Sequence, residues 1–154
     1  MTDHTPRLFA TTAEIRRLGE GLIDCSLARA DWTHEAHLGA TLYLVVERSD
    51  LDLDAELPGF IRRFNESVGG RNTDSEGYHH TITLTYLAAI RDHARETEGQ
   101  ELCARANALL LSARGRRDWP LRFYSEARLF ATEARLSFVP PDRESISYKT
   151  KTIA

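Results

Sequence analysis

Two short stretches of the chain place histidines at the head of otherwise apolar segments. The stretch DWTHEAHLGATLYLVV carries His34 and His37 three residues apart, and the later stretch GYHHTITLTYL carries His79 and His80 side by side. Together they hold four of the six histidines of the chain. A neutral imidazole can ligate a metal ion or act as a general base. Both stretches are therefore candidates for a chemical site.

The spacing of the first pair suits a helix. Residues three apart lie on one face about one turn apart, so His34 and His37 can reach the same ion or ligand. The pattern is not the HExxH of zinc proteases, which needs histidines four apart. The positive end of the helix dipole disfavours imidazolium, so histidines at a helix start tend to present a lone pair. Histidines that only cap the helix or pack in the core are the alternative.

The elements that must position these residues are helices. Apolar residues recur at spacings of three and four along most of the chain, and no run reads as a convincing strand. We therefore predict an all-α, single-domain bundle of about five to six helices with an extended C-terminal tail. The predicted helices are one capped by Thr11 or Thr12 and reaching Leu27, one over 33–48 with Thr33 as N-cap, one containing 57–64, one over 81–95, one over 100–112 and one beginning at Asp118 with Pro120 in its first turn.

Several details of this pattern leave alternatives open. The run TITLTY at Thr81 alternates and also fits a short strand. The near-repeat EARLFAT and EARLSFV indicates one interrupted helical region, with Leu129 and Leu136 on a shared core stripe. The helix over 33–48 is apolar on nearly every face, which predicts the central, buried helix of the bundle.

Connectivity predicts that the two histidine stretches meet. Consecutive helices joined by short connections are antiparallel neighbours. The helices that start near His34 and His79 therefore begin at the same end of the bundle, with Asn65 at the foot of the returning helix and Tyr78 beside them. The same alternation brings the basic segment Arg114–Arg117 to that end, under a long loop over 67–78.

We assign roles in this expected site as follows. His34, His37 and His79 are the candidate ligands of a zinc or iron ion, with one position left open for water or substrate. The candidate catalytic residues are His34, His79, Tyr78 and Asn65. His80 is expected to face solvent and His93 to lie on the surface. We expect that His34→Ala abolishes function without loss of stability, whereas His37→Ala lowers both.

Composition limits the classes of partner. A chain of 154 residues with 42% hydrophobic and 28% charged residues is typical of one globular domain, here 1–154 with a bundle over 11–138 and a tail over 139–154. The net charge of −3 gives no attraction to nucleic acid or to an anionic membrane. We expect a cytoplasmic, soluble protein with two unpaired thiols, Cys25 and Cys103, no nucleic-acid or membrane partner, and a homodimer left open.

The motifs also resemble a known set of sequences. The stretches WTHEAHL, FNES, GYHHTIT, YSEARLF and PPD are similar to those of an uncharacterised family of small bacterial proteins, over about Trp32 to Asp142. The family patterns are W-[TS]-H-x-A-H-L and G-Y-H-x-T-[IL]-T, and His80 falls at a variable position of the second. The resemblance implies one shared site and no particular reaction. Its members would be Trp32, His34, His37, Asn65, Tyr78, His79 and Thr81.

Two classes of function follow from these observations. The first is a small enzyme with a histidine-centred, metal-dependent site that acts on a small molecule, with the arginines at the rim favouring an anionic substrate. The second is a metal-free module that binds or senses a small ligand in the same pocket. Metal-free acid/base catalysis by His34 or His79 is a third reading, which predicts turnover without a metal.

Overall fold

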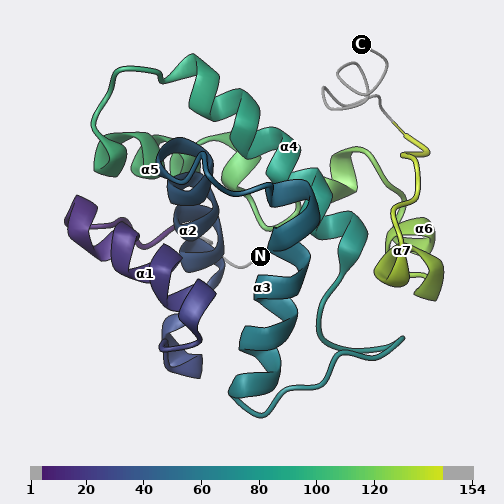
Figure 1. The fold of residues 1–154 in the computed structure, drawn as a ribbon. Coiled ribbons are helices and arrows are strands. Elements are labelled where there is room, and N and C mark those ends of the chain that lie inside the picture. Colours follow the sequence, from purple (N-terminus) through teal and green to yellow (C-terminus); the bar gives the residue numbers. More distant parts are fainter. Residues whose placement is uncertain (1–4, 144–154) are drawn as a thin grey trace.

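The computed structural model describes residues 5–143, and this part of the chain is helical without strands. Within residues 5–143, five α-helices have ten residues or more and two are shorter. Figure 1 shows the longer helices packed together and the short α6 and α7 beyond the start of α4. The α-helices are α1 (Thr12–Asp24), α2 (His34–Glu47), α3 (Leu53–Ser67), α4 (His80–Glu96), α5 (Leu102–Leu111), α6 (Glu126–Leu129) and α7 (Thr132–Leu136). The 3-10 turns are Arg29–Asp31, Ala113–Gly115 and Trp119–Arg122. The all-α prediction is confirmed, and TITLTY forms the start of α4 rather than a strand.

The helix starts follow from side-chain caps. Thr11 accepts a hydrogen bond from the Glu14 amide and Thr33 from the Ala36 amide, as the sequence predicts for α1 and α2. Asp52 caps α3 in the same way, so this helix begins earlier than its apolar pattern indicates. Each cap satisfies one of the amides that a helix leaves without an internal partner.

Helix α2 is the centre of the bundle, as predicted. Every residue from Leu38 to Leu44 is buried, and the helix packs against α1, α4 and α5. Figure 1 shows α1 against α2, with α4 crossing above them. Even this most apolar helix has only 14 residues. Within residues 5–143, no helix has the length and hydropathy to cross a bilayer.

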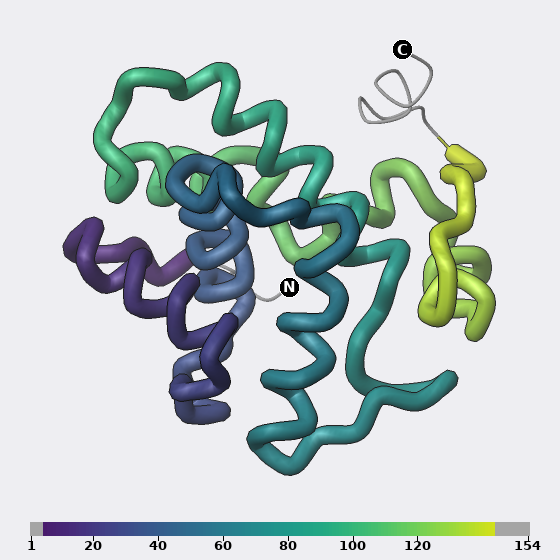
Figure 2. The backbone as a smooth tube through the Cα atoms, in the orientation of Figure 1, coloured from purple at the N-terminus to yellow at the C-terminus, as the bar shows by residue number. Residues whose placement is uncertain are grey.

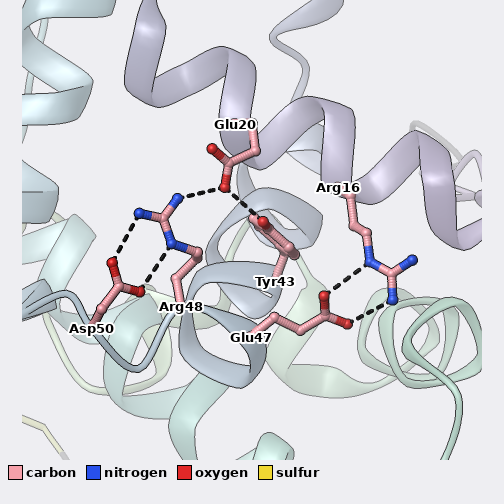
Figure 3. A network of polar contacts seen from close by, with 6 residues as sticks. All are labelled: Arg16, Glu20, Tyr43, Glu47, Arg48 and Asp50. Carbon is pink, nitrogen blue, oxygen red and sulfur yellow. Dashed lines mark hydrogen bonds and ion pairs between the residues drawn. The ribbon is translucent and has the colours of Figure 1, made fainter.

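A polar network joins the surface sides of α1 and α2 (Figure 3). The Tyr43 hydroxyl donates to Glu20 at 2.6 Å, and Arg48 donates to the same Glu20 oxygen while forming a two-armed pair with Asp50. One turn earlier on α1, Arg16 makes a two-armed pair with Glu47. Exposed pairs of this kind each contribute little, so the network orients the two helices more than it stabilises them.

The C-terminal quarter differs from the prediction. The expected helix from Asp118 is a 3-10 turn over Trp119–Arg122, followed by the short α6 and α7. Leu129 is buried but Leu136 is 57% exposed, so the predicted shared core stripe is wrong. The interruption between α6 and α7 breaks the heptad phase that the stripe required.

The structure describes the first five residues of the predicted tail over 139–154. Residues 139–143 have no helix, but they are tied to the body: the buried Tyr124 hydroxyl donates to the Val139 carbonyl at 2.7 Å. Asp142 accepts from both the amide and the hydroxyl of Ser125. Residues 144–154 lie outside the described part of the chain. Residues 139–143 therefore close a second, small apolar cluster around α6 and α7.

His93 is buried, which corrects the expectation that it lies on the surface. Its exposed fraction is 6%, and its Nε2 donates to the Arg105 carbonyl at 2.8 Å. The Arg105 side chain is also buried and donates to the Thr97 hydroxyl and to the Ala94 carbonyl at the end of α4. A cation there satisfies carbonyls at the negative end of the helix dipole. The sequence showed charged residues at Arg91, Asp92 and Arg95 around His93 and not the α5 face packed against it.

The long connection between α3 and α4 is a shaped loop. Figure 2 shows it swinging out below the helices before α4 begins. The Asn65 side chain donates to the Arg71 carbonyl and to the Asn72 side chain, whose oxygen also accepts from the Tyr78 amide. Gly77 has φ of 83°, a left-handed conformation that suits glycine. These contacts fix the positions of Tyr78 and His79 at the start of α4.

Candidate functional site

A pocket of about 530 Å³ lies where α2, α3 and α4 come together. Each helix contributes one face at spacings of three and four, the signature of an inward stripe. From α2 these residues are His34, His37, Leu38 and Thr41; from α3, Leu57, Ile61 and Asn65; from α4, Ile82, Thr83, Tyr86, Leu87 and Ile90. Trp32, Gly77, Tyr78, His79 and Arg117 complete the lining. Its volume is in the range of pockets that hold small molecules.

The structure brings most of the predicted site residues to this one pocket. Of the seven residues grouped by the motif resemblance, all but Thr81 line it. Thr81 is fully buried on another side of α4, where its hydroxyl donates to the Ser137 carbonyl and accepts from the Val139 amide. Thr81 therefore joins α4 to the C-terminal segment and has no contact with the pocket.

His37 lines the pocket, and its side chain makes no hydrogen bond to the described part of the protein. Its ring packs on Trp32 with centroids 4.1 Å apart, and Trp32 packs in turn on Phe64 at 5.4 Å. Residues 5–143 contain no buried side-chain nitrogen or oxygen that lacks a partner, so the His37 ring nitrogens must face open space. The adjoining open space is the pocket.

The His37 imidazole is neutral at physiological pH. Desolvation, followed by the charge of His34, lowers the pKa of His37 to about 3. A neutral ring carries one N–H and one lone pair, so it can donate one hydrogen bond and accept another. His37 therefore offers both functions to whatever occupies the pocket.

His34 has a structural bond that His37 lacks. Its Nε2 lies 2.9 Å from the carbonyl oxygen of the buried Gly115, and a carbonyl can only accept, so Nε2 carries the proton. In the neutral ring the lone pair then sits on Nδ1. Burial lowers the pKa of His34. The bond ties the start of α2 to a turn that lies far along the chain.

His79 caps a helix rather than presenting a free lone pair. Its Nδ1 accepts from the Ile82 amide at 3.1 Å, and its Nε2 donates to the Leu129 carbonyl at 2.8 Å. Burial lowers the pKa of His79. Both ring nitrogens are thus engaged with backbone. The sequence could not reveal this, because histidine is not among the usual capping residues.

The residues present do not fit the predicted three-histidine metal centre in this arrangement. His79 has no lone pair to give, and within residues 5–143 no group of three His, Cys, Asp or Glu side chains is placed to hold a metal ion. Two imidazole lone pairs, on His34 and His37, remain available beside the pocket. Zinc or iron binding stays a prediction.

Tyr78 forms a wall of the pocket, and its hydroxyl is engaged elsewhere. The side chain is buried, its hydroxyl lies 2.9 Å from His80 Nδ1, and the Arg62 guanidinium sits over the ring at 4.4 Å. His80 is half-buried instead of facing solvent, and it does not line the pocket. Asn65 borders the pocket but uses its amide nitrogen to hold the loop. Tyr78 and Asn65 thus shape the pocket in this arrangement.

The arginines of the basic segment Arg114–Arg117 have two different roles. Arg114 pairs with Glu96 and Arg116 pairs with Asp118, each through two arms. Arg117 lines the pocket while remaining exposed, and it makes no hydrogen bond or ion pair with a described residue. The sequence placed all four residues at this end, and the structure brings Arg117 to the mouth of the pocket.

Sequence reasoning overlooked the contribution of α4. Tyr86 faces His34 with ring centroids 5.7 Å apart, and its hydroxyl donates to the Arg116 carbonyl. Burial raises the pKa of Tyr86. The positions 79, 82, 83, 86, 87 and 90 follow a helical period from His79, so the inward stripe was present in the sequence.

We expect the stability of the protein to fall as the pH drops from 7 to 5, in part because of His37. The unfolded state takes up a proton near the ordinary histidine pKa, whereas folded His37 stays neutral until about pH 3, so acid favours unfolding. For His37 alone the linkage amounts to about 2 kcal/mol between pH 7 and pH 5. Urea unfolding at both pH values should show a smaller loss in His37→Phe than in the wild type. Equal losses would contradict a neutral, desolvated His37.

Comparisons of the chain with protein-family models, with curated protein sequences and with solved structures find no match. The family resemblance drawn from the motifs therefore stays a prediction. The chemistry of the pocket is the basis for inferring function.

Proposed function

We propose that the protein binds a small molecule in the pocket between α2, α3 and α4, with the apolar part of the ligand against the helix faces and a polar group at His37. The observation that supports this most directly is the imidazole of His37, which has no hydrogen-bond partner among residues 5–143 and adjoins about 530 Å³ of space. An unused polar group in such a position costs stability unless a ligand or solvent satisfies it. A mostly apolar pocket with a few placed polar groups is the usual form of a ligand site.

Binding is better supported than proton abstraction by His37. A general base works best when its pKa lies near the working pH, and a pKa of about 3 makes His37 a poor base at neutral pH. The same low pKa suits a constant hydrogen-bonding role, because the ring keeps one donor and one acceptor over the whole physiological range. We therefore favour the ligand-binding reading over acid/base catalysis by this residue.

A metal-dependent enzyme is the second candidate. It is favoured by the spacing of His34 and His37, which both line the pocket and both retain a lone pair. Such an ion would take the remaining ligands from water or substrate, since His79 is committed to backbone groups. Elemental analysis of untagged protein, with His34→Ala and His37→Ala beside it, tests this candidate: metal that is lost in both variants supports it.

The test of the proposed function is a ligand-observed NMR screen of a diverse library of small molecules against the full chain. Each hit is repeated on Ile61→Trp, which adds bulk from the α3 face into the pocket, and on Arg63→Trp, which adds the same side chain at an exposed position of α3. Circular dichroism confirms that both variants fold. We expect the hits to be lost in Ile61→Trp and kept in Arg63→Trp. Hits that persist in Ile61→Trp would place binding elsewhere and contradict the proposal.

A further inference from the structure

The described lining of the pocket carries full charge of one sign only, although Glu35 and Asp118 act on lining residues from outside it. Of the described residues that line it, Arg117 alone carries a full charge at neutral pH, and the lining has no carboxylate. The two histidines that face it from α2 are kept neutral by burial, which lowers the pKa of each. The whole chain, in contrast, has a net charge of −3. The pocket thus has a single cationic point at its mouth, against the overall charge of the protein.

Arg117 differs from Arg114 and Arg116 because it forms no ion pair with a described carboxylate, although its charge interacts with that of Glu35. Arg114 and Arg116 each hold a carboxylate, and Arg117 forms no ion pair or hydrogen bond with residues 5–143. An exposed arginine without a partner is ordinary on a surface. Here it also borders a pocket, so its guanidinium lies within reach of a bound molecule.

The backbone just before Arg117 is held from two directions. His34 donates to the Gly115 carbonyl, and Tyr86 donates to the Arg116 carbonyl. Both donors are themselves part of the pocket lining. The bonds therefore fix the turn that presents Arg117 at the pocket, which lowers the ordering cost of pairing with a ligand.

The rest of the lining is suited to hydrocarbon. Its largest group consists of leucine and isoleucine side chains from α2, α3 and α4, with aromatic rings at Trp32, Tyr78 and Tyr86. No second cation lines the pocket among the described residues. A dianion such as a phosphate monoester would need more positive charge than one guanidinium supplies, whereas the fork of an arginine matches one carboxylate.

We propose that the pocket takes an amphipathic monocarboxylate, with the carboxylate paired to Arg117 at the mouth and an alkyl or aryl chain inside. This inference rests on the proposed function and adds the class of ligand to it. The pairing is partly exposed to solvent, so it is expected to weaken with added salt.

The experiment is calorimetric titration of the full chain with three matched pairs of probes: hexanoate, octanoate and phenylacetate, each beside its primary amide. In the wild type we expect each carboxylate to bind at least about tenfold more tightly than its amide, which corresponds to about 1.4 kcal/mol. Arg117→Gln should abolish this preference while leaving amide binding unchanged. Arg114→Gln, in the same segment but paired with Glu96, should leave the preference intact.

Each remaining outcome decides against one or both proposals. If the amides bind as tightly as the acids, or if the preference survives in Arg117→Gln, the carboxylate inference is wrong and the binding function stands. If the probes fail but the diverse library yields neutral ligands that Ile61→Trp loses, the inference alone fails. If neither the probes nor the library bind, both proposals fail.

Discussion

Gly77→Ala is expected to lower the free energy of unfolding by about 3 kcal/mol. Gly77 has φ of 83°, and a Cβ there would lie 2.1 Å from the Arg71 carbonyl oxygen, which is a backbone atom and cannot swing aside. The side chain would therefore add a collision to the strain of a left-handed conformation. Because Gly77 and Tyr78 both line the pocket, ligand binding should weaken as well.

Gly69→Ala is the matched control in the same loop. Gly69 also has a positive φ, of 92°, but a Cβ there meets nothing within 4 Å. This variant pays only the conformational cost, about 1–2 kcal/mol. Urea unfolding of both variants isolates the collision at Gly77. Equal destabilisation of the two variants would show that the loop around Arg71 is not held as described.

The second large effect is that substitutions of the two histidines of α2 change different properties, ligand binding for His37 and stability for His34. His37→Phe is expected to weaken ligand binding by about tenfold to a hundredfold, because the polar group of the ligand loses its partner in a desolvated site. Its stability at pH 7 should be unchanged or higher, since the replaced ring has no hydrogen bond to the described part of the protein and packs on Trp32. Binding isotherms and urea unfolding of the same preparation measure both quantities.

For His34→Phe we expect the opposite pattern, in which stability falls and ligand binding changes little. It leaves the buried Gly115 carbonyl without its donor, at a cost of about 1–3 kcal/mol. This reverses the expectation from helix geometry, which assigned function to His34 and structural partners to His37. If His37→Phe unfolds readily and His34→Phe does not, the assignment of the two imidazoles is wrong.

The helices could be predicted where local chemistry decides them. The capping oxygens of Thr11 and Thr33 predict the starts of α1 and α2, and the apolar run of α2 predicts that this helix is buried. The region after Asp118 could not be predicted in the same way. Short helices such as α6 and α7 are too brief to be stable alone, so packing around Tyr124 and Val139 decides their form.

The meeting of the two histidine stretches followed from connectivity, but the role of each ring did not. His79 caps α4 and bonds to Leu129, and His34 bonds to Gly115; both partners lie far along the chain. The spacing of residues in the sequence does not predict hydrogen bonds to backbone carbonyls that lie so far along the chain. For the same reason the sequence does not show that the His37 side chain lacks a hydrogen-bond partner among residues 5–143, although it does predict the position of His37 one turn inside α2.

A crystal structure of the full chain with a hit from the NMR screen tests the central claim most directly. We predict that the ligand lies between α2, α3 and α4 against Trp32, with a polar atom within about 3.2 Å of a His37 ring nitrogen. A ligand bound on another face, or a His37 ring already bonded to a protein group with the pocket filled by side chains, would contradict it.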